Sequence, residues 1–214
     1  MKLCAICGIR PATTSDHIPP KGLYAKPYPA NMHTVPACAK CNQGGASADE
    51  IMKIMIGLST GELRPDSPMV LDSMRRTLKK NKRLRREVIQ SSKPTFHPLH
   101  GQIFRPAVAV HFDGKPYIEV ITRIVKALYW VEKGSALGLA AKVDVEIFDQ
   151  IDDPGRVALV QTLMNSLEPR HLNESTFVYK VTFDESGCSI WGLMFFGGHL
   201  AIATADAPAH LIVS

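Results

Sequence analysis

The stretch that decides the fold of the N-terminal part reads Cys4-Ala-Ile-Cys7, then Asp16-His17-Ile18-Pro19-Pro20, then Cys38-Ala-Lys-Cys41-Asn42. A Cys-x-x-Cys pair holds two thiolates at a spacing that suits a tetrahedral ion, and two such pairs supply the four sulfurs of a closed zinc site. The 30 residues between Cys7 and Cys38 exceed the spacing of a simple zinc ribbon, so the loop must have structure of its own. We therefore predict one structural zinc ion that pins both ends of a loop containing Asp16 and His17.

The composition is typical of a globular protein from a reducing compartment. At 214 residues the chain suffices for one or two domains and a sizeable core. Four of its five cysteines stand in Cys-x-x-Cys pairs, and the sequence shows neither a secretory leader nor an apolar run of membrane-spanning length. We expect a cytoplasmic protein that does not enter a membrane. Cys188, in an apolar stretch near Trp191, is expected to be a buried, inert thiol.

Charge is distributed unevenly along the chain. Residues 51–93 carry 11 basic and 4 acidic groups, whereas residues 94–214 carry 9 basic and 13 acidic groups. The first 50 residues are mildly basic. A basic N-terminal part joined to an acidic C-terminal part predicts that the first 93 residues bind a polyanion, and DNA is the natural candidate.

The order of elements in the N-terminal part follows from prolines, glycines and capping residues. A strand containing Asp16 and His17 should end at Ile18-Pro19-Pro20, because proline fixes its own backbone and restricts the residue before it. Residues 21–32 have the pattern of a loop. The second cysteine pair then opens a helical segment in which Ser47 and Glu50 form a capping-box pattern. Whether this segment is one helix or two is left open by its glycines.

A basic helix is predicted from Ser67, as N-cap before Pro68, to about Gln90. Its apolar positions recur at helical spacing, at Leu71, Met74, Leu78, Leu84 and Val88. Its other faces carry eight basic residues, namely Arg75, Arg76, Lys79, Lys80, Lys82, Arg83, Arg85 and Arg86. Repulsion between like charges lowers helix stability, so the segment gains from a phosphate partner. The alternative is a solvated helix face whose charges serve only solubility.

Beyond Pro94 the pattern predicts an α+β domain. We expect a strand over 103–112, a helix over 117–133 that stops at Gly134, and a second helix from Pro154 to about Leu167. Three strands over 175–184, 188–196 and 199–205 should form an antiparallel meander. The fold prediction is α+β, with a zinc module at 1–60, a basic helical linker at 61–93 and an α+β domain at 94–214. The six histidines after residue 94 are scattered and are expected to be structural or surface groups.

The N-terminal motifs together resemble the HNH endonucleases with a four-cysteine zinc, a group that includes phage junction-resolving endonucleases. The longer strings Asp16–Tyr24 and Thr34–Asn42 resemble bacterial HNH proteins whose C-terminal parts are poorly characterised. The resemblance covers about residues 1–50. It implies a ββα-metal fold in which the zinc is structural and a separate magnesium or manganese ion takes part in the chemistry.

The chemistry of phosphodiester hydrolysis agrees with these residue types. Histidine is largely neutral near pH 7 and can take a proton from the attacking water, so His17 is the predicted general base. Asp16 and the side-chain carbonyl of Asn42 offer the oxygen ligands that a hard divalent cation takes. Neighbouring strand residues point to opposite faces, so Asp16 and His17 can serve cation and water together only if the strand is bent or bulged.

The remaining role in the resembled motif is an asparagine that braces the loop. We assign it to Asn31, although His33 is nearer to the usual offset from the second cysteine pair. A second departure from the resembled motif is Gly44-Gly45, which replaces the basic residue often found just after the second cysteine pair. The predicted function is a metal-dependent endonuclease acting on DNA. One alternative is a non-catalytic zinc finger that binds nucleic acid or protein through the same module. Another is a toxin or defence effector whose C-terminal domain senses a signal.

Overall fold

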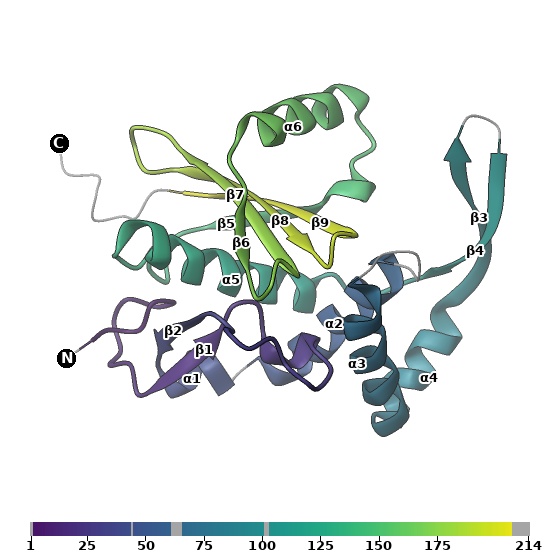
Figure 1. The fold of residues 1–214 in the computed structure, drawn as a ribbon, viewed down its shortest axis with the longest axis horizontal. Helices are drawn as coiled ribbons and strands as arrows, with labels where there is room; N and C mark the ends of the chain where they lie inside the picture. The colour runs from purple at the N-terminus through teal and green to yellow at the C-terminus, as the bar shows by residue number, and fades with distance from the viewer. Residues whose placement is uncertain (1, 44, 61–65, 101–102, 207–214) are drawn as a thin grey trace.

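The computed structural model describes residues 2–43, 45–60, 66–100 and 103–206, and it confirms the α+β class. A five-stranded antiparallel sheet has the order β5-β9-β8-β7-β6 (Figure 1). Its strands are β5 (Val143–Ile147), β6 (Arg170–Leu172), β7 (Phe177–Phe183), β8 (Ser189–Phe195) and β9 (His199–Ala205). The predicted meander is therefore present as β7, β8 and β9, whereas the short strands β5 and β6 were not predicted.

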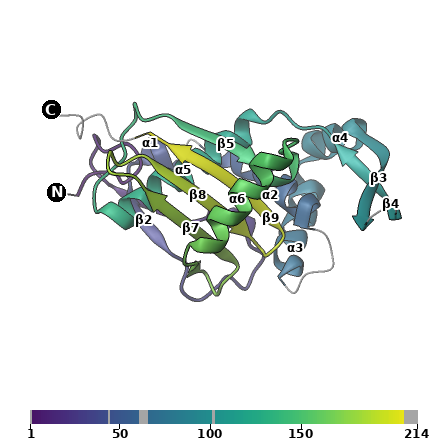
Figure 2. The same ribbon diagram turned by 90° about the horizontal axis from the view of Figure 1, so that it is seen from above.

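Two helices lie on opposite faces of this sheet. Helix α5 (Lys115–Lys133) runs along the lower face, and α6 (Pro154–Ser166) crosses the upper face, as Figure 2 shows from above. The expected stop of α5 at Gly134 is confirmed, because Gly134 takes the left-handed conformation, with φ 69°, that a C-cap glycine favours. Asp153 caps α6 by accepting from the backbone N–H groups of Gly155 and Arg156.

Alternation along β8 and β9 decides which side chains meet α5. Trp191, Leu193 and Phe195 on β8 are fully buried, and small Ala201 and Ala203 occupy the corresponding face of β9. The small side chains of β9 allow the helix to approach closely, while the large side chains of the neighbouring strand β8 fill the flanking space. This packing makes α5 a buried helix with few exposed positions.

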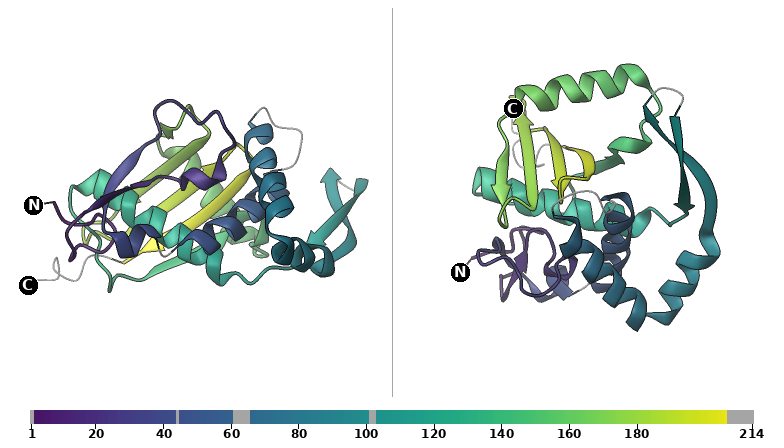
Figure 3. Two further views of the ribbon diagram at one scale, coloured as in Figure 1. Left: turned by 90° about the horizontal axis from the view of Figure 1, so that it is seen from below. Right: turned by 45° about the vertical axis from the view of Figure 1, so that its right-hand side comes forward.

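The N-terminal segment packs on the side of α5 that faces away from the sheet (Figures 1 and 3). It contains the hairpin of β1 (Thr14–His17) and β2 (Thr34–Ala37), followed by α1 (Ala39–Gln43) and α2 (Ala46–Thr60). Strand β1 ends at His17, directly before Ile18-Pro19-Pro20, as predicted. The helical segment left open by the sequence is two helices, and α2 begins at Ala46, one residue before the predicted cap at Ser47.

The basic segment is two helices, α3 (Ser67–Lys80) and α4 (Lys82–Ser91), where one continuous helix was predicted. Asn81 causes the break: its backbone ends α3, and its side chain caps α4 by accepting from the N–H of Leu84. The predicted cap at Ser67 is also wrong by one residue, because Asp66 occupies the N-cap. Leu71, Met74 and Leu84 are buried against Ile54 of α2, so the apolar stripe of the sequence is the packed face.

Helix α4 leads into a separate hairpin of β3 (Ser92–His100) and β4 (Ile103–Val110) that extends away from the body (Figure 3). Strand β4 was predicted, but β3 was not, because Pro94 and Pro98 argue against a strand. A two-stranded ribbon leaves one edge of each strand unpaired and therefore tolerates proline there. Phe96 and Val108 on this hairpin are exposed.

One continuous apolar core joins the cysteine-bearing segment to the sheet. Cys4, Ile18 and Val35 belong to the same buried cluster as Ile121 of α5 and Trp191 of β8. The division into parts at 1–60, 61–93 and 94–214 stays a prediction. Cys188 is half-buried, beside the Ser186 hydroxyl, where a buried thiol was expected. No helix in the described part of the chain is long and apolar enough to span a membrane.

Candidate metal centre and active site

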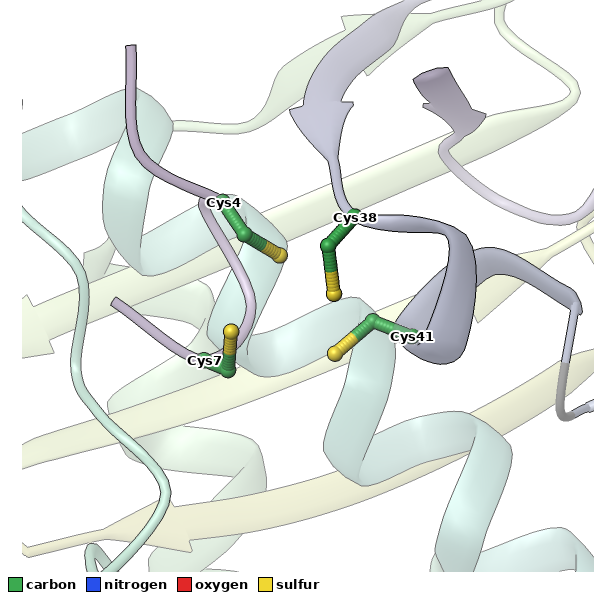
Figure 4. Close-up of side chains that lie close together, drawn as sticks. All are labelled: Cys4, Cys7, Cys38 and Cys41. Carbon is green, nitrogen blue, oxygen red and sulfur yellow. The ribbon is translucent and has the colours of Figure 1, made fainter. Parts of the chain in front are cut away.

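The four predicted zinc ligands lie together. The sulfur atoms of Cys4, Cys7, Cys38 and Cys41 are all within 4.8 Å of one another and point toward a common centre (Figure 4). A tetrahedral ion with Zn–S bonds near 2.3 Å requires sulfurs about 3.8 Å apart, so small shifts would complete the geometry. Cys4, Cys7 and Cys38 are buried. Among the described residues, this is the only group of three or more His, Cys, Asp or Glu side chains that could hold a metal ion such as zinc.

Arg10 supplies positive charge to this centre. Its Nε donates to Cys38 Sγ at 3.0 Å and its Nη2 donates to Cys41 Sγ at 3.2 Å. Burial works to raise the pKa of Cys38, but the hydrogen bonds from Arg10 and the Cys41 backbone outweigh it and lower this pKa to about 6. Burial raises the pKa of Cys41 to about 12, which Arg10 only partly offsets. Four thiols in one cavity cannot all ionise against a single guanidinium, and a bound dication would make all four thiolates favourable.

Asp16 faces the interior of the protein. On β1 it pairs with the buried Val35 of β2, and only 8% of the residue is exposed. Its Oδ2 lies 3.3 Å from Nε of Arg123, which projects from α5, and Nη2 of the same guanidinium lies 2.5 Å from Oδ1 of Asp49 on α2. Burial raises the pKa of Asp16 to about 6, because the attraction of Arg123 is partly cancelled by the neighbouring Asp49. Asp16, the predicted ligand of the divalent metal ion, is thus already in contact with the guanidinium of Arg123.

Gly45 explains how Arg123 reaches both carboxylates. A Cβ atom at Gly45 would lie 1.8 Å from Nη1 of Arg123, so any larger residue here would displace the guanidinium from its present position. The positive charge beside Gly45 therefore comes from α5, which lies far along the sequence.

His17 occupies the other face of β1. It pairs with Thr34 in a regular register, and no bulge or register shift interrupts the four residues of β1. A bulge that would bring His17 and Asp16 to one face is therefore absent from β1. His17 is half-buried, and burial, assisted by the nearby Lys21, lowers its pKa. A histidine in this state is neutral at pH 7 and able to accept a proton.

Asn42 ties the start of the helical segment to β1. Its Nδ2 donates to Thr14 Oγ1 and to the carbonyl oxygen of Ser15, each at 3.1 Å. The structure thus brings Asn42 to the strand that carries Asp16 and His17. Its side-chain oxygen has no hydrogen bond among the described residues. Asp16 and Asn42 each carry a side-chain oxygen of the kind that a hard divalent cation takes.

Asn31, the predicted brace, lies exposed in a turn and has no side-chain hydrogen bond within the described part of the chain. The loop between the two strands is instead contacted by Asn173, from the turn between β6 and β7. Neither Asn173 nor Arg123 was identified from the sequence. The sequence contains one indication of the role of Arg123. A charged residue within the largely apolar segment 121–125 suggests a buried partner.

The eight predicted DNA-binding residues of α3 and α4 are all exposed. Two of them form surface ion pairs within their own helix, Arg75 with Asp72 and Arg83 with Glu87, each at 3.6 Å. Pairs this exposed contribute little stability and can exchange for phosphate contacts. The eight basic side chains therefore all reach the surface of α3 and α4.

His199 is a buried histidine that the sequence did not single out. Its Nε2 lies 2.6 Å from the Tyr117 hydroxyl and its Nδ1 lies 2.6 Å from Ser59 Oγ. Since Ser59 donates to the carbonyl of Ile56, one assignment satisfies every group: Tyr117 donates to Nε2, and a proton on Nδ1 is donated to Ser59. Burial lowers the pKa of His199 to about 4. The residue links α2, α5 and β9 as a neutral structural group.

A hollow of about 690 Å³ opens elsewhere, beside Met55, His111, Tyr117 and Arg156, and none of the predicted site residues lines it. Comparison with known families, with curated proteins and with solved structures finds no match to this chain.

Proposed function

We propose that this protein is a metal-dependent endonuclease of the HNH type that hydrolyses phosphodiester bonds in DNA. The observation that supports the proposal most is the β1–β2–α1 arrangement, in which Asn42 is hydrogen-bonded to the strand that carries Asp16 and His17. The four-cysteine centre lies at the base of the same unit. In this proposal its metal is a structural zinc ion, which holds the strands and the helix in place.

Each residue has a defined task in the proposed reaction. His17, neutral at pH 7, takes the proton of the attacking water. Asp16 and Asn42 would hold the divalent cation, magnesium or manganese, which would supply stabilisation of the negative charge on the departing oxygen. The eight exposed basic residues of α3 and α4 hold the DNA backbone. Because Arg123 contacts Asp16 Oδ2, the cation must share this carboxylate with a guanidinium.

A second candidate is a zinc protein that binds DNA and does not cut it. The ion pair between Asp16 and Arg123 favours this candidate, because an internal guanidinium meets the charge requirement of the carboxylate without any metal. The regular register of β1, which keeps Asp16 and His17 on opposite faces, favours it as well.

A plasmid-nicking assay separates the two candidates. The wild type should nick DNA with Mg²⁺ or Mn²⁺ and stop when EDTA is added at a dose that leaves the zinc content unchanged. Asp16→Ala should lose activity and regain part of it at higher Mn²⁺, whereas Asp144→Ala, an exposed carboxylate on β5, should cut as the wild type does. A wild type that binds DNA but cuts no duplex, branched or single-stranded substrate would establish the second candidate.

A further inference from the structure

The turn between β6 and β7 has an unusual backbone. Asn173, Glu174 and Ser175 all have positive φ, at 52°, 57° and 64°. Residues other than glycine rarely adopt this left-handed conformation, although asparagine tolerates it better than most. Three in succession produce a tight turn that directs the side chain of Asn173 into the protein, where only 3% of the residue is exposed.

That side chain contacts the hairpin where β1 ends and β2 begins. Nδ2 of Asn173 donates to the carbonyl oxygen of Ile18 at 2.9 Å, and Oδ1 accepts from the N–H of His33 at 2.9 Å. The backbone N–H of Ile18 also donates to the carbonyl of His33. The amide of Asn173 therefore continues the strand ladder by one further step, directly after His17 and its partner Thr34.

Neighbouring contacts hold Asn173 in this position. The second hydrogen of its Nδ2 is directed to the hydroxyl of Tyr24, which also accepts from Thr176 Oγ1. Glu174 accepts from the N–H of Ala30, so the same turn touches the loop at a second place. With both donors and its acceptor used in a buried site, Asn173 cannot be replaced without leaving backbone groups unpaired.

We propose that Asn173 is a positioning residue for His17: it fixes the backbone on both sides of the loop that follows His17, and thereby the place of the imidazole. Asn173, from the C-terminal part of the chain, would thus brace the loop that follows His17. The sequence had assigned this task to Asn31. This inference rests on the proposed nuclease function.

The test compares Asn173→Gly with Ser175→Gly. Glycine keeps the left-handed backbone at either position, but only the first change removes the amide, since the exposed Ser175 has no side-chain hydrogen bond among the described residues. Two quantities are measured on zinc-loaded full-length protein: amide hydrogen exchange in peptides covering residues 18–33, and cleavage rate against DNA concentration. Asn173→Ser, whose hydroxyl is too short to reach both backbone groups, replaces the glycine variant if that variant cannot be purified.

Asn173→Gly should exchange faster over residues 18–33 and cleave roughly ten- to a hundredfold more slowly at saturating DNA, with the half-saturating DNA concentration unchanged. Ser175→Gly should match the wild type in both measurements. Unchanged exchange in Asn173→Gly would overturn the brace, and faster exchange with unchanged cleavage would overturn the positioning role. If the wild type cuts no DNA while exchange rises only in Asn173→Gly, the nuclease proposal fails and the positioning role falls with it, although the bracing contact stands.

Discussion

Replacing Arg123 by methionine should destabilise the protein far more than the loss of one ion pair on the surface. The guanidinium is the shared partner of Asp16 and Asp49, at 3.3 and 2.5 Å, and the side chains of Arg123 and Asp16 are only 9% and 11% exposed. Methionine fills much of the volume but leaves two carboxylates facing each other. Removing one partner of a buried ion pair typically costs about 3–5 kcal/mol, because an uncompensated charge remains in a poorly solvated site.

A matched control is available on the surface. Arg156 lies 2.6 Å from Glu146, about as close as Arg123 lies to Asp49, but its side chain is 56% exposed. Arg156→Met should therefore cost only about 0–1 kcal/mol, which isolates burial as the cause of the difference. Adding Asp49→Asn to Arg123→Met should recover part of the loss, because one of the two facing charges is then gone.

The assay is urea unfolding of zinc-loaded protein at pH 7.5, with midpoints and slopes compared among the four proteins. The cost of Arg123→Met should be smaller at pH 5, since the pKa of Asp16 is about 6 and a protonated carboxyl no longer needs the guanidinium. A cost of Arg123→Met no greater than that of Arg156→Met would refute the reasoning.

Three further predictions concern the metal, the histidine core and the basic surface. Cys38→Ser should lower the zinc content and the melting temperature, because thiolate ligation contributes to folding, and metal analysis with thermal denaturation checks this. His199 has a folded pKa of about 4, below the ordinary 6.5, so the unfolded chain protonates first as pH falls. The contribution of His199 to stability should therefore drop by about 3 kcal/mol between pH 6.5 and 4, and this loss should be missing from His199→Gln. Equal slopes in both proteins would contradict the neutral assignment of His199. Four basic residues of α3 should be replaced by glutamine together, namely Arg75, Arg76, Lys79 and Lys80. This variant should bind DNA more weakly and with a flatter salt dependence, whereas glutamine at Lys142 and Arg156 should change neither.

Features determined by neighbouring residues could be predicted from the sequence. The spacing of Cys4, Cys7, Cys38 and Cys41 predicted their cluster, and Ile18-Pro19-Pro20 predicted the end of β1. The helix that ends at Gly134 and the meander of β7, β8 and β9 also follow from local pattern. In each case the determining residues lie within a few positions of the element, or share a motif whose spacing has a chemical meaning.

Features determined by contacts across the chain could not be predicted. Asn173 meets Ile18 from 155 positions away, and Arg123 reaches Asp16 from a helix that packs between the sheet and the hairpin. No period or motif encodes such a meeting, because it depends on how α5 and the β6–β7 turn dock on the N-terminal segment. The break at Asn81 is different: an asparagine among charged helix formers is a local capping signal, and the apolar period on both sides of it concealed the break.

The proposed nuclease activity depends most on His17, which would take a proton from the attacking water. The most direct test measures single-turnover cleavage of DNA in Mg²⁺ by His17→Ala, with His171→Ala, an exposed histidine on β6, as the control. We expect a cleavage rate for His17→Ala about a hundred- to ten-thousandfold below that of the wild type, with DNA affinity and zinc content unchanged, and a normal rate for His171→Ala. Cleavage by His17→Ala at the wild-type rate would contradict this role of His17.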